Sequence, residues 1–232
     1  MEIRYEKNID EIFSESLQET LLTKTVAVIG CGGQGGYVIE YLARLGVKAV
    51  YIWDGDVFEE SNLNRQIGCT LNTIGKNKAE ILSERFKEIN TTTNIICFNH
   101  YFGMKNDDLD NLKQVDIIIH CADAFINIAA VRSLEKKAIM AGIPCIDCPT
   151  GILGGLVCIE TPKSIAHFDY QTEEMMQYLH HGQRISQPAY KCALVAAEAI
   201  NQMVQYFDNS RYASINSVLE IDIYHHRYIE HD

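Results

Sequence analysis

The chain contains 232 residues, and its 31 Asp and Glu against 20 Lys and Arg give a formal net charge of −11 at pH 7. Apolar residues make up 47% and charged residues 22%, which excludes disorder as a description of the whole chain. The acidic balance argues against nucleic acid as a partner, since phosphate neutralisation needs clustered Lys and Arg. The sequence lacks both a secretory signal and an apolar run near the roughly 18 residues of a membrane span, so we expect a cytoplasmic protein without a membrane partner.

The first 24 residues predict a separate amphipathic helix. Asn8 is a suitable N-cap, and Glu11 follows three residues later as in a capping box. The apolar residues expected to share one face of this helix are Ile9, Ile12, Phe13 and Leu17.

Strand and helix patterns alternate between residues 25 and 150. The predicted strands are short and apolar, as in a buried parallel sheet: Thr25–Ile29, Ala49–Trp53, Asn94–Asn99, Val115–Cys121 and Pro144–Cys148. The predicted helices have apolar residues with a period near 3.6: Tyr37–Leu45, Lys78–Ile89 and Phe125–Met140. This alternation predicts the α/β class, with a doubly wound, Rossmann-like and mostly parallel sheet.

The pattern changes after residue 150. Ile152–Glu160 predicts a strand with a kink at its glycine pair, and residues 161–190 predict a long connection. Ala193–Phe207 predicts a helix, and Val218–Tyr228 alternates like one strand. We therefore expect one domain over residues 1–232, with a helical arm at 1–24, a nucleotide-binding core at 25–150 and a short mixed-sheet extension at 151–232.

A glycine-rich run, Gly30-Cys31-Gly32-Gly33-Gln34-Gly35-Gly36, joins the first strand to the next helix. Glycines allow a tight turn and let a phosphate approach the backbone, and the helix N-terminus attracts anions. Asp54 ends the second strand, 24 residues after Gly30, where an acid can accept the hydroxyls of a ribose. The pattern predicts nucleotide binding, although a tight turn without a ligand would have the same glycines.

The segment beyond Asp54 favours a triphosphate over a dinucleotide. A helix N-terminus is enough to hold a bridging pyrophosphate, whereas a triphosphate benefits from Arg and Lys on its outer phosphates. The polar residues that follow Asp54 supply such groups, unless they form only a solvated loop: Asn62, Arg65, Gln66 and Lys78.

Four sequence runs, taken together, resemble the ThiF/MoeB/HesA family. They are V-A-V-I-G-C-G-G-Q-G-G, D-G-D, S-N-L-N-R-Q and I-G-K-N-K-A. These proteins are bacterial relatives of the ubiquitin-activating enzymes, and the resemblance is good over residues 4–155 and loose beyond. It implies ATP-dependent adenylation of a C-terminal carboxylate, usually on the Gly-Gly tail of a ubiquitin-like or sulfur-carrier protein.

The resemblance also implies a role for individual residues. The phosphates would be lined by Gly30, Gly32, Gly33 and Gly35, and the ribose would be held by Asp54. The triphosphate would be contacted by Asn62, Arg65, Gln66 and Lys78, and Mg²⁺ would be held by Asp123. A terminal carboxylate with a pKa of about 3.5 is ionised at pH 7 and needs no general base. The expected catalytic groups are therefore Arg65, Lys78 and Asp123.

The sequence departs from the family in three places. Many members bind structural zinc through two Cys-x-x-Cys pairs, but this chain has only Cys145 and Cys148, so we expect no structural zinc. Residues 161–190 lack the cysteine that some members use for transfer chemistry, and we expect Cys192 to be structural. Arg4-Tyr5-Glu6-Lys7 resembles the R-Y-x-R of family homodimers, in which the second Arg reaches the ATP of the other subunit. Lys7 would take that place, unless the terminus is simply frayed.

Other assignments also follow from the sequence. Four cysteines in apolar runs are expected to be core residues: Cys97, Cys121, Cys145 and Cys158. Asp147, at a strand end, could shape a substrate channel or cap a turn. The open alternatives for function are adenylation of a peptide terminus or tRNA-borne carboxylate, a nicotinamide oxidoreductase, and a binding module without catalysis.

Overall fold

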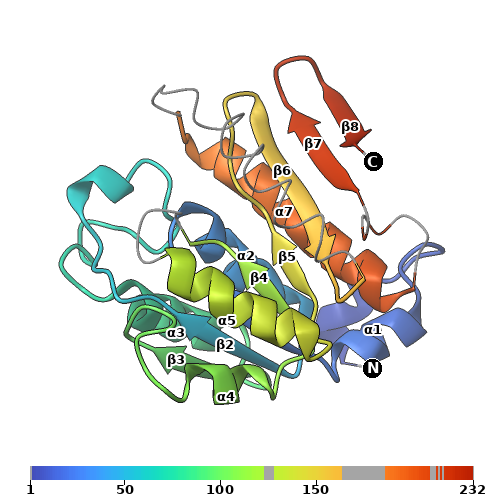
Figure 1. Ribbon diagram of the computed structural model, residues 1–232, viewed down its shortest axis with the longest axis horizontal. Coiled ribbons are helices and arrows are strands. Elements are labelled where there is room, and N and C mark those ends of the chain that lie inside the picture. The colour runs from blue at the N-terminus through green and yellow to red at the C-terminus, as the bar shows by residue number, and fades with distance from the viewer. Residues whose placement is uncertain are drawn as a thin grey trace.

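The computed structural model describes residues 2–122, 128–163, 186–209, 213, 215 and 217–231. The described strands form one eight-stranded sheet in the order β3-β2-β1-β4-β5-β6-β7-β8, with helices on both of its faces (Figure 1). The predicted α/β class and Rossmann-like arrangement are confirmed. The division of residues 1–232 into arm, core and extension stays a prediction.

Five strands form the parallel part of the sheet. They are β1 (Thr25–Ile29), β2 (Ala49–Trp53), β3 (Asn94–Phe98), β4 (Ile117–His120) and β5 (Cys145–Asp147). The structure reproduces the predicted bounds of β1 and β2, and the other three strands are shorter than predicted. All residues of β1 and β4 are buried, as expected for mainly β-branched strands that are covered on both faces.

Helices cover both faces of this sheet. On one face lie α1 (Glu15–Leu21), α2 (Gly33–Leu45), α3 (Lys78–Ile89) and α7 (Ala189–Phe207), and on the other lie α4 (Asp108–Leu112) and α5 (Ile128–Met140). The predicted bounds of α3 agree with the structure, because Asn77 caps the helix by accepting a hydrogen bond from the Glu80 N–H. The predicted residues 125–127 lie outside the described part of the chain.

The predicted N-terminal helix starting after Asn8 is wrong. Residues Ile3–Asn8 form a 3₁₀ helix, η1, and α1 begins only at Glu15. The Asp10 carboxylate accepts hydrogen bonds from the N–H groups of residues 12 and 13, which makes a turn where the helix was expected. Ser14 is the actual N-cap, and Ile12 is 86% exposed rather than on a packed face.

The C-terminal part adds antiparallel strands. They are β6 (Gly154–Glu160), β7 (Val218–Asp222) and β8 (Arg227–His231), so the sheet is mixed as predicted. The single strand predicted over residues 218–228 is wrong, because β7 and β8 form a hairpin. Asp222 accepts a hydrogen bond from the His225 N–H and His226 has a φ of +56°, so the chain reverses despite its alternating pattern. Most of the predicted connection, residues 164–185, lies outside the described residues.

No helix in the described part of the chain is both long and apolar enough to cross a membrane.

A buried lysine joins the first turn of α7 to the segments beside it. Lys191 has no exposed surface, and its Nζ donates to the carbonyl oxygens of Gly151, Ile152 and Ser186 at 3.2, 3.0 and 2.9 Å. A buried ammonium group is stable only when its donors are satisfied, as they are here. Lys191 therefore holds the start of α7 against the turn that precedes β6.

Replacing Lys191 by Met should lower the free energy of unfolding by about 3 kcal/mol or more, because the change leaves buried carbonyl groups without a donor. Chemical denaturation followed by circular dichroism measures this. Lys113→Met is the matched control, since that side chain is 66% exposed and its loss should change stability by about 0.5 kcal/mol at most. Equal stability of the two variants would contradict the proposed role of Lys191.

Candidate functional site

A cavity opens at the carboxyl ends of the parallel strands, beside the N-terminus of α2. It has a volume of about 830 Å³, part of it open to solvent. This is the edge at which doubly wound sheets bind ligands. The residues lining it include Gly30, Gly32, Gly33, Gln34, Trp53, Asp54, Asp56, Arg65, Gln66, Lys78, Tyr101, Phe102, Cys121, Gln187 and Cys192.

The glycine-rich loop owes its shape to two close approaches. Gly30 has a φ of +94°, and a Cβ there would lie 2.7 Å from the Ala122 nitrogen. A Cβ on Gly35 would lie 1.9 Å from the Gly30 oxygen, so only glycine lets α2 begin this close to the end of β1. Gly30, Gly32 and Gly33 line the cavity, and their contact with phosphates stays a prediction. Gly35 is not among its lining residues, and its place is in the packing of the loop.

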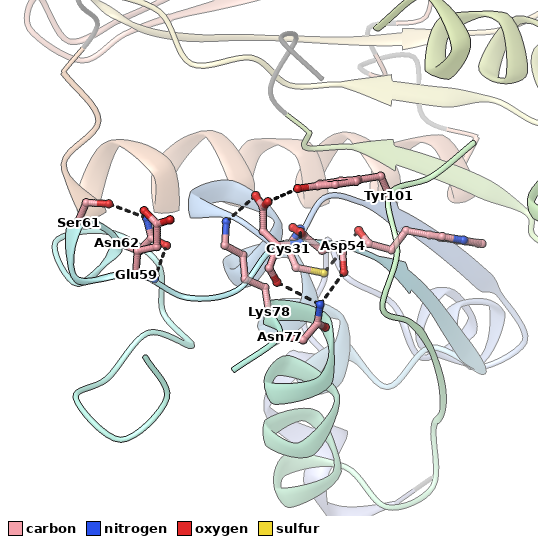
Figure 2. Close-up of polar contacts among 10 residues, drawn as sticks. Cys31, Asp54, Glu59, Ser61, Asn62, Asn77, Lys78 and Tyr101 are labelled. Atoms are coloured by element: carbon pink, nitrogen blue, oxygen red, sulfur yellow. Dashed lines mark hydrogen bonds and ion pairs between the residues drawn. The ribbon is translucent and has the colours of Figure 1, made fainter. Parts of the chain in front are cut away.

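Asp54 joins the glycine-rich loop to the loop after β2. Its Oδ2 accepts a hydrogen bond from the Cys31 N–H at 2.7 Å, and its Oδ1 accepts one from the Asp56 N–H at 2.8 Å (Figure 2). Burial raises the pKa of this carboxyl group above its usual value, while the two N–H donors oppose the rise. The side chain predicted to hold a ribose thus lines the cavity and also fixes both loops.

Lys78 lies at the cavity in an ion pair with Asp56. Its Nζ lies 3.0 Å from Asp56 Oδ2, and the Tyr101 hydroxyl donates a hydrogen bond to the other carboxylate oxygen (Figure 2). Although burial opposes it, the Tyr101 hydroxyl and Lys78 hold the pKa of Asp56 below its usual value. The same hydrogen bond, with burial, raises the pKa of Tyr101 to about 12. A negatively charged Asp56 therefore partners Lys78.

Local sequence places Lys78 as the first residue of α3. The Asn77 amide donates to the carbonyl oxygens of Asp54 and Asp56, both at 3.0 Å, while Asn77 also caps the helix (Figure 2). The Lys78 N–H in turn donates to the Asp56 carbonyl oxygen at 2.9 Å. One side chain therefore fixes both the start of α3 and the distance between Lys78 and the acidic loop.

The predicted polar residues of the loop after β2 divide into two groups. Arg65 and Gln66 line the cavity, and the buried Gln66 Oε1 has no hydrogen-bond partner in the described part of the chain. Asn62 does not line it. The Asn62 side chain accepts from the Glu59 N–H and donates to the Ser61 hydroxyl, within the short 3₁₀ helix η2 (Glu60–Asn62; Figure 2). Asn62 therefore shapes the loop that carries Arg65.

Two predicted site residues remain to be placed. Asp123, the expected Mg²⁺ ligand, lies outside the described residues. Lys7 is exposed on η1 and does not line the cavity of its own chain. Sequence reasoning missed Asp56 and Tyr101. The D-G-D run contained a sequence signal for Asp56. Tyr101 follows β3, and no motif around it indicated a place at the site.

An aromatic wall bounds another part of the cavity. Trp53 stacks on Phe98 with ring centroids 4.4 Å apart, packs edge-on against Phe102, and donates its indole N–H to Asp108. Trp53 and Phe102 both line the cavity. The site therefore offers cations and a glycine-rich helix start for phosphates, and flat apolar rings for a base.

The Cys-x-x-Cys residues point to opposite faces of the sheet. Cys145 packs in the core beside α5, whereas Cys148 packs in the core beside α2 and α7, with its Sγ 3.8 Å from Cys121 Sγ. The two thiols therefore cannot hold one ion together. Of the predicted core cysteines, Cys121, Cys145 and Cys158 are buried and Cys97 is half-buried. Cys192 is buried as well, at the cavity.

The fold and this cavity define a Rossmann-like α/β protein with a cation-lined cleft at its glycine-rich loop. The chain belongs to the ThiF family, whose sequence model matches residues 5–231.

Curated relatives match part of the chain. It is 39% identical over 108 residues to a probable molybdopterin-synthase adenylyltransferase of Porphyra purpurea, and 31% identical over 143 residues to the tRNA threonylcarbamoyladenosine dehydratase of Bacillus subtilis. These matches cover 47% and 62% of this chain. The chain spans only 28% and 55% of the length of those two proteins.

The fold is similar to that of E. coli MccB, with a TM-score of 0.81 at 20% identity in a crystal structure with succinimide. The match covers all of this chain and 72% of the MccB chain. At 20% identity, this similarity shows that the two proteins share a fold.

Replacing Gly35 by Ala should destabilise the protein by about 3 kcal/mol or more, because the added methyl group meets the backbone oxygen of Gly30. Thermal unfolding of the nucleotide-free protein measures this loss of stability separately from any effect on nucleotide binding. Gly32→Ala is the control, since the nearest atom to its Cβ is the Gln66 amide nitrogen at 3.8 Å. We expect that variant to lose about 1 kcal/mol at most, and a similar loss in both would contradict the packing role of Gly35.

Proposed function

We propose that this protein catalyses the ATP- and Mg²⁺-dependent adenylation of the C-terminal carboxylate of a small ubiquitin-like or sulfur-carrier protein ending in Gly-Gly. The observation that carries the proposal is the convergence of Lys78 and Arg65 on the cavity formed by the glycine-rich loop. A nicotinamide oxidoreductase would leave these two cations and Gln66 without a role.

The chemistry needs charge stabilisation rather than proton transfer. The ionised substrate carboxylate attacks the α-phosphorus of ATP, the bond to the bridging oxygen breaks, and pyrophosphate leaves with its electron pair. Two anions must approach each other and negative charge builds on the leaving group, so cations are the useful catalysts. Arg65 and Lys78 would supply them, and the N-terminus of α2 would bind phosphate oxygens.

Lys78 has to exchange partners when ATP binds. In the structure its ammonium group lies against Asp56, which is also held by Tyr101. We infer that the phosphates compete for Lys78 while Tyr101 keeps the Asp56 carboxylate in place. The unpartnered Gln66 Oε1 is an acceptor at the same cavity that a ribose hydroxyl could satisfy.

Mg²⁺ fits the donor set at this edge of the sheet, because it prefers carboxylate oxygens and phosphate oxygens together. Asp54 and Asp56 line the cavity, and Asp123 would hold the ion. Bound Mg²⁺ would neutralise charge on the triphosphate.

The identity of the carboxylate is the finer part of the proposal. The Porphyra relative is named as an adenylyltransferase of molybdopterin synthase, which supports a protein carrier as substrate. The second candidate substrate is the carboxylate of a peptide terminus. MccB, which shares the fold, has been solved with ATP and with N-formylated MccA. The Bacillus relative is named for a tRNA modification, but the charge of −11 makes a tRNA-borne carboxylate the weaker choice.

Replacing Lys78 by Ala should lower the rate of ATP–pyrophosphate exchange by two to three orders of magnitude, or about 3 kcal/mol, by removing a cation at the phosphates. The assay uses the full chain with a Gly-Gly-ending carrier, and in parallel with other peptides, to identify the carboxylate. Lys76→Ala is the matched control, because Lys76 is exposed and does not line the cavity. Full activity of the Lys78 variant, or no exchange with any carboxylate by the wild type, would overturn the proposal.

We further propose a cytoplasmic homodimer in which Lys7 reaches the ATP of the partner subunit, since Lys7 is exposed and away from its own cavity. The exchange activities of the variants Lys7→Ala and Lys78→Ala, measured separately and after mixing, test this. Each variant alone should have little activity. Heterodimers should then contain one intact site, and random pairing should restore about a quarter of wild-type exchange activity. If Lys7 acts within its own chain or not at all, mixing restores nothing beyond the sum of the two variants.

A further inference from the structure

Four side chains with metal-binding chemistry lie together on the antiparallel pair β5 and β6. Asp147 is directly opposite Cys158, and Cys145 is directly opposite Glu160. Because side chains alternate along a strand, all four point to the same face of the sheet, which is the face covered by α5. This patch lies outside the cavity described above.

Three of these residues form a compact donor set. A carboxylate oxygen of Asp147, the Sγ of Cys158 and a carboxylate oxygen of Glu160 all lie within 4.8 Å of one another, and all three residues are buried. A tetrahedral ion with ligand bonds of 2.0–2.3 Å separates its ligand atoms by about 3.3–3.8 Å. Side-chain shifts of about an ångström would therefore bring the set into bonding distance.

One oxygen of Glu160 lacks a hydrogen-bond partner among the described residues. The side chain is 5% exposed and Oε2 is the oxygen without a partner, while Glu160 also interacts with the Asp147 carboxylate. Asp147 is different, because Arg132 Nη1 lies 3.0 and 2.9 Å from its two oxygens and His120 Nδ1 lies 3.3 Å away. A buried carboxylate that has one unpartnered oxygen and lies beside a second carboxylate needs a cation or a proton.

The charges around the patch lead to the same conclusion. Among the described residues, three carboxylates, on Glu135, Asp147 and Glu160, lie near two cations, His120 and Arg132, and His120 Nδ1 also lies 2.8 Å from Glu135. If Glu160 is ionised, these described groups carry one excess negative charge. A divalent ion together with an ionised Cys158 would make the sum zero, which a buried cluster requires.

We propose that Asp147, Cys158 and Glu160 bind a divalent transition-metal ion of the Zn²⁺ type. A thiolate with two carboxylates suits Zn²⁺ better than Mg²⁺ or Ca²⁺, which prefer oxygen alone. Binding releases the Cys158 proton, and any proton on Glu160, to solvent. Arg132 and His120 contact the Asp147 carboxylate, and contacts of this kind orient the ligands of a metal ion.

The ion would join β5 to β6, where the sheet changes from parallel to antiparallel. The site is independent of the proposed adenylation. The expectation of no structural zinc rests on the missing second Cys-x-x-Cys pair, and the same metal analysis tests both.

A proton is the competing occupant. Without an ion, burial and then the Asp147 carboxylate raise the pKa of Glu160 to about 11, so a neutral carboxylic acid would also remove the excess charge. Glu160→Gln separates the two occupants, because Gln resembles the neutral acid in shape and charge but is a poor metal ligand.

The experiment measures metal in the untagged full chain by mass spectrometry, before and after chelation and reloading with Zn²⁺. We expect about one equivalent of Zn²⁺ per chain. Reloading with Co²⁺ should give a thiolate-to-metal charge-transfer band in the near ultraviolet. Circular dichroism shows that each variant remains folded.

Cys158→Ser should abolish the Co²⁺ band, and Cys158→Ser and Glu160→Gln should each weaken Zn²⁺ binding at least tenfold, since even outer-shell changes cost about 10–100-fold. Cys97→Ser is the control, because it removes a half-buried thiol on β3, distant from β5 and β6 in the sheet order. Absence of bound metal in the wild type, or metal retained by both ligand variants, would overturn the proposal and leave a proton on Glu160.

Discussion

The Asp54 carboxylate connects the two loops on which the candidate site depends. One oxygen accepts from the N–H of the glycine-rich loop and the other accepts from the N–H of Asp56, so a single buried side chain sets the distance between them. Asn77 repeats this connection from the other side by donating to both backbone carbonyls of the D-G-D run. The Asn77 side chain therefore sets the position of Lys78, the next residue, relative to the D-G-D run.

The change of strand direction within the sheet separates the cavity from the proposed metal site. The parallel strands β1, β2 and β4 end at one edge, so the glycine-rich loop, the acidic loop and Lys78 meet there. The antiparallel pairing of β5 and β6 instead sets residues of the two strands face to face, which places Asp147 opposite Cys158. One sheet thus supports a loop-built cavity and a strand-built cluster with separate chemistry.

The sequence predicted the fold class and most elements because the buried strands are uniformly apolar and the long helices have a clear 3.6 period. It failed where local polar contacts compete with that pattern. Asp10 stops the predicted N-terminal helix, and the turn after Asp222 divides a sequence that alternates like one strand. At the site, the motifs identified Asp54, Arg65, Gln66 and Lys78 at the cavity. The motifs could not show that Gly35 and Asn62 only shape the loops, whereas neighbouring residues of the same motifs line the cavity.

The sequence by itself determined which residues follow the ends of the parallel strands, because strand ends and helix starts are local features with local signals. Only the tertiary structure decided which side chains meet across the sheet. Tyr101 contacts Asp56 from 45 residues away, and Glu160 approaches Asp147 from another strand. Such contacts depend on strand order and register, which arise from the packing of the whole chain and leave no pattern in any one segment.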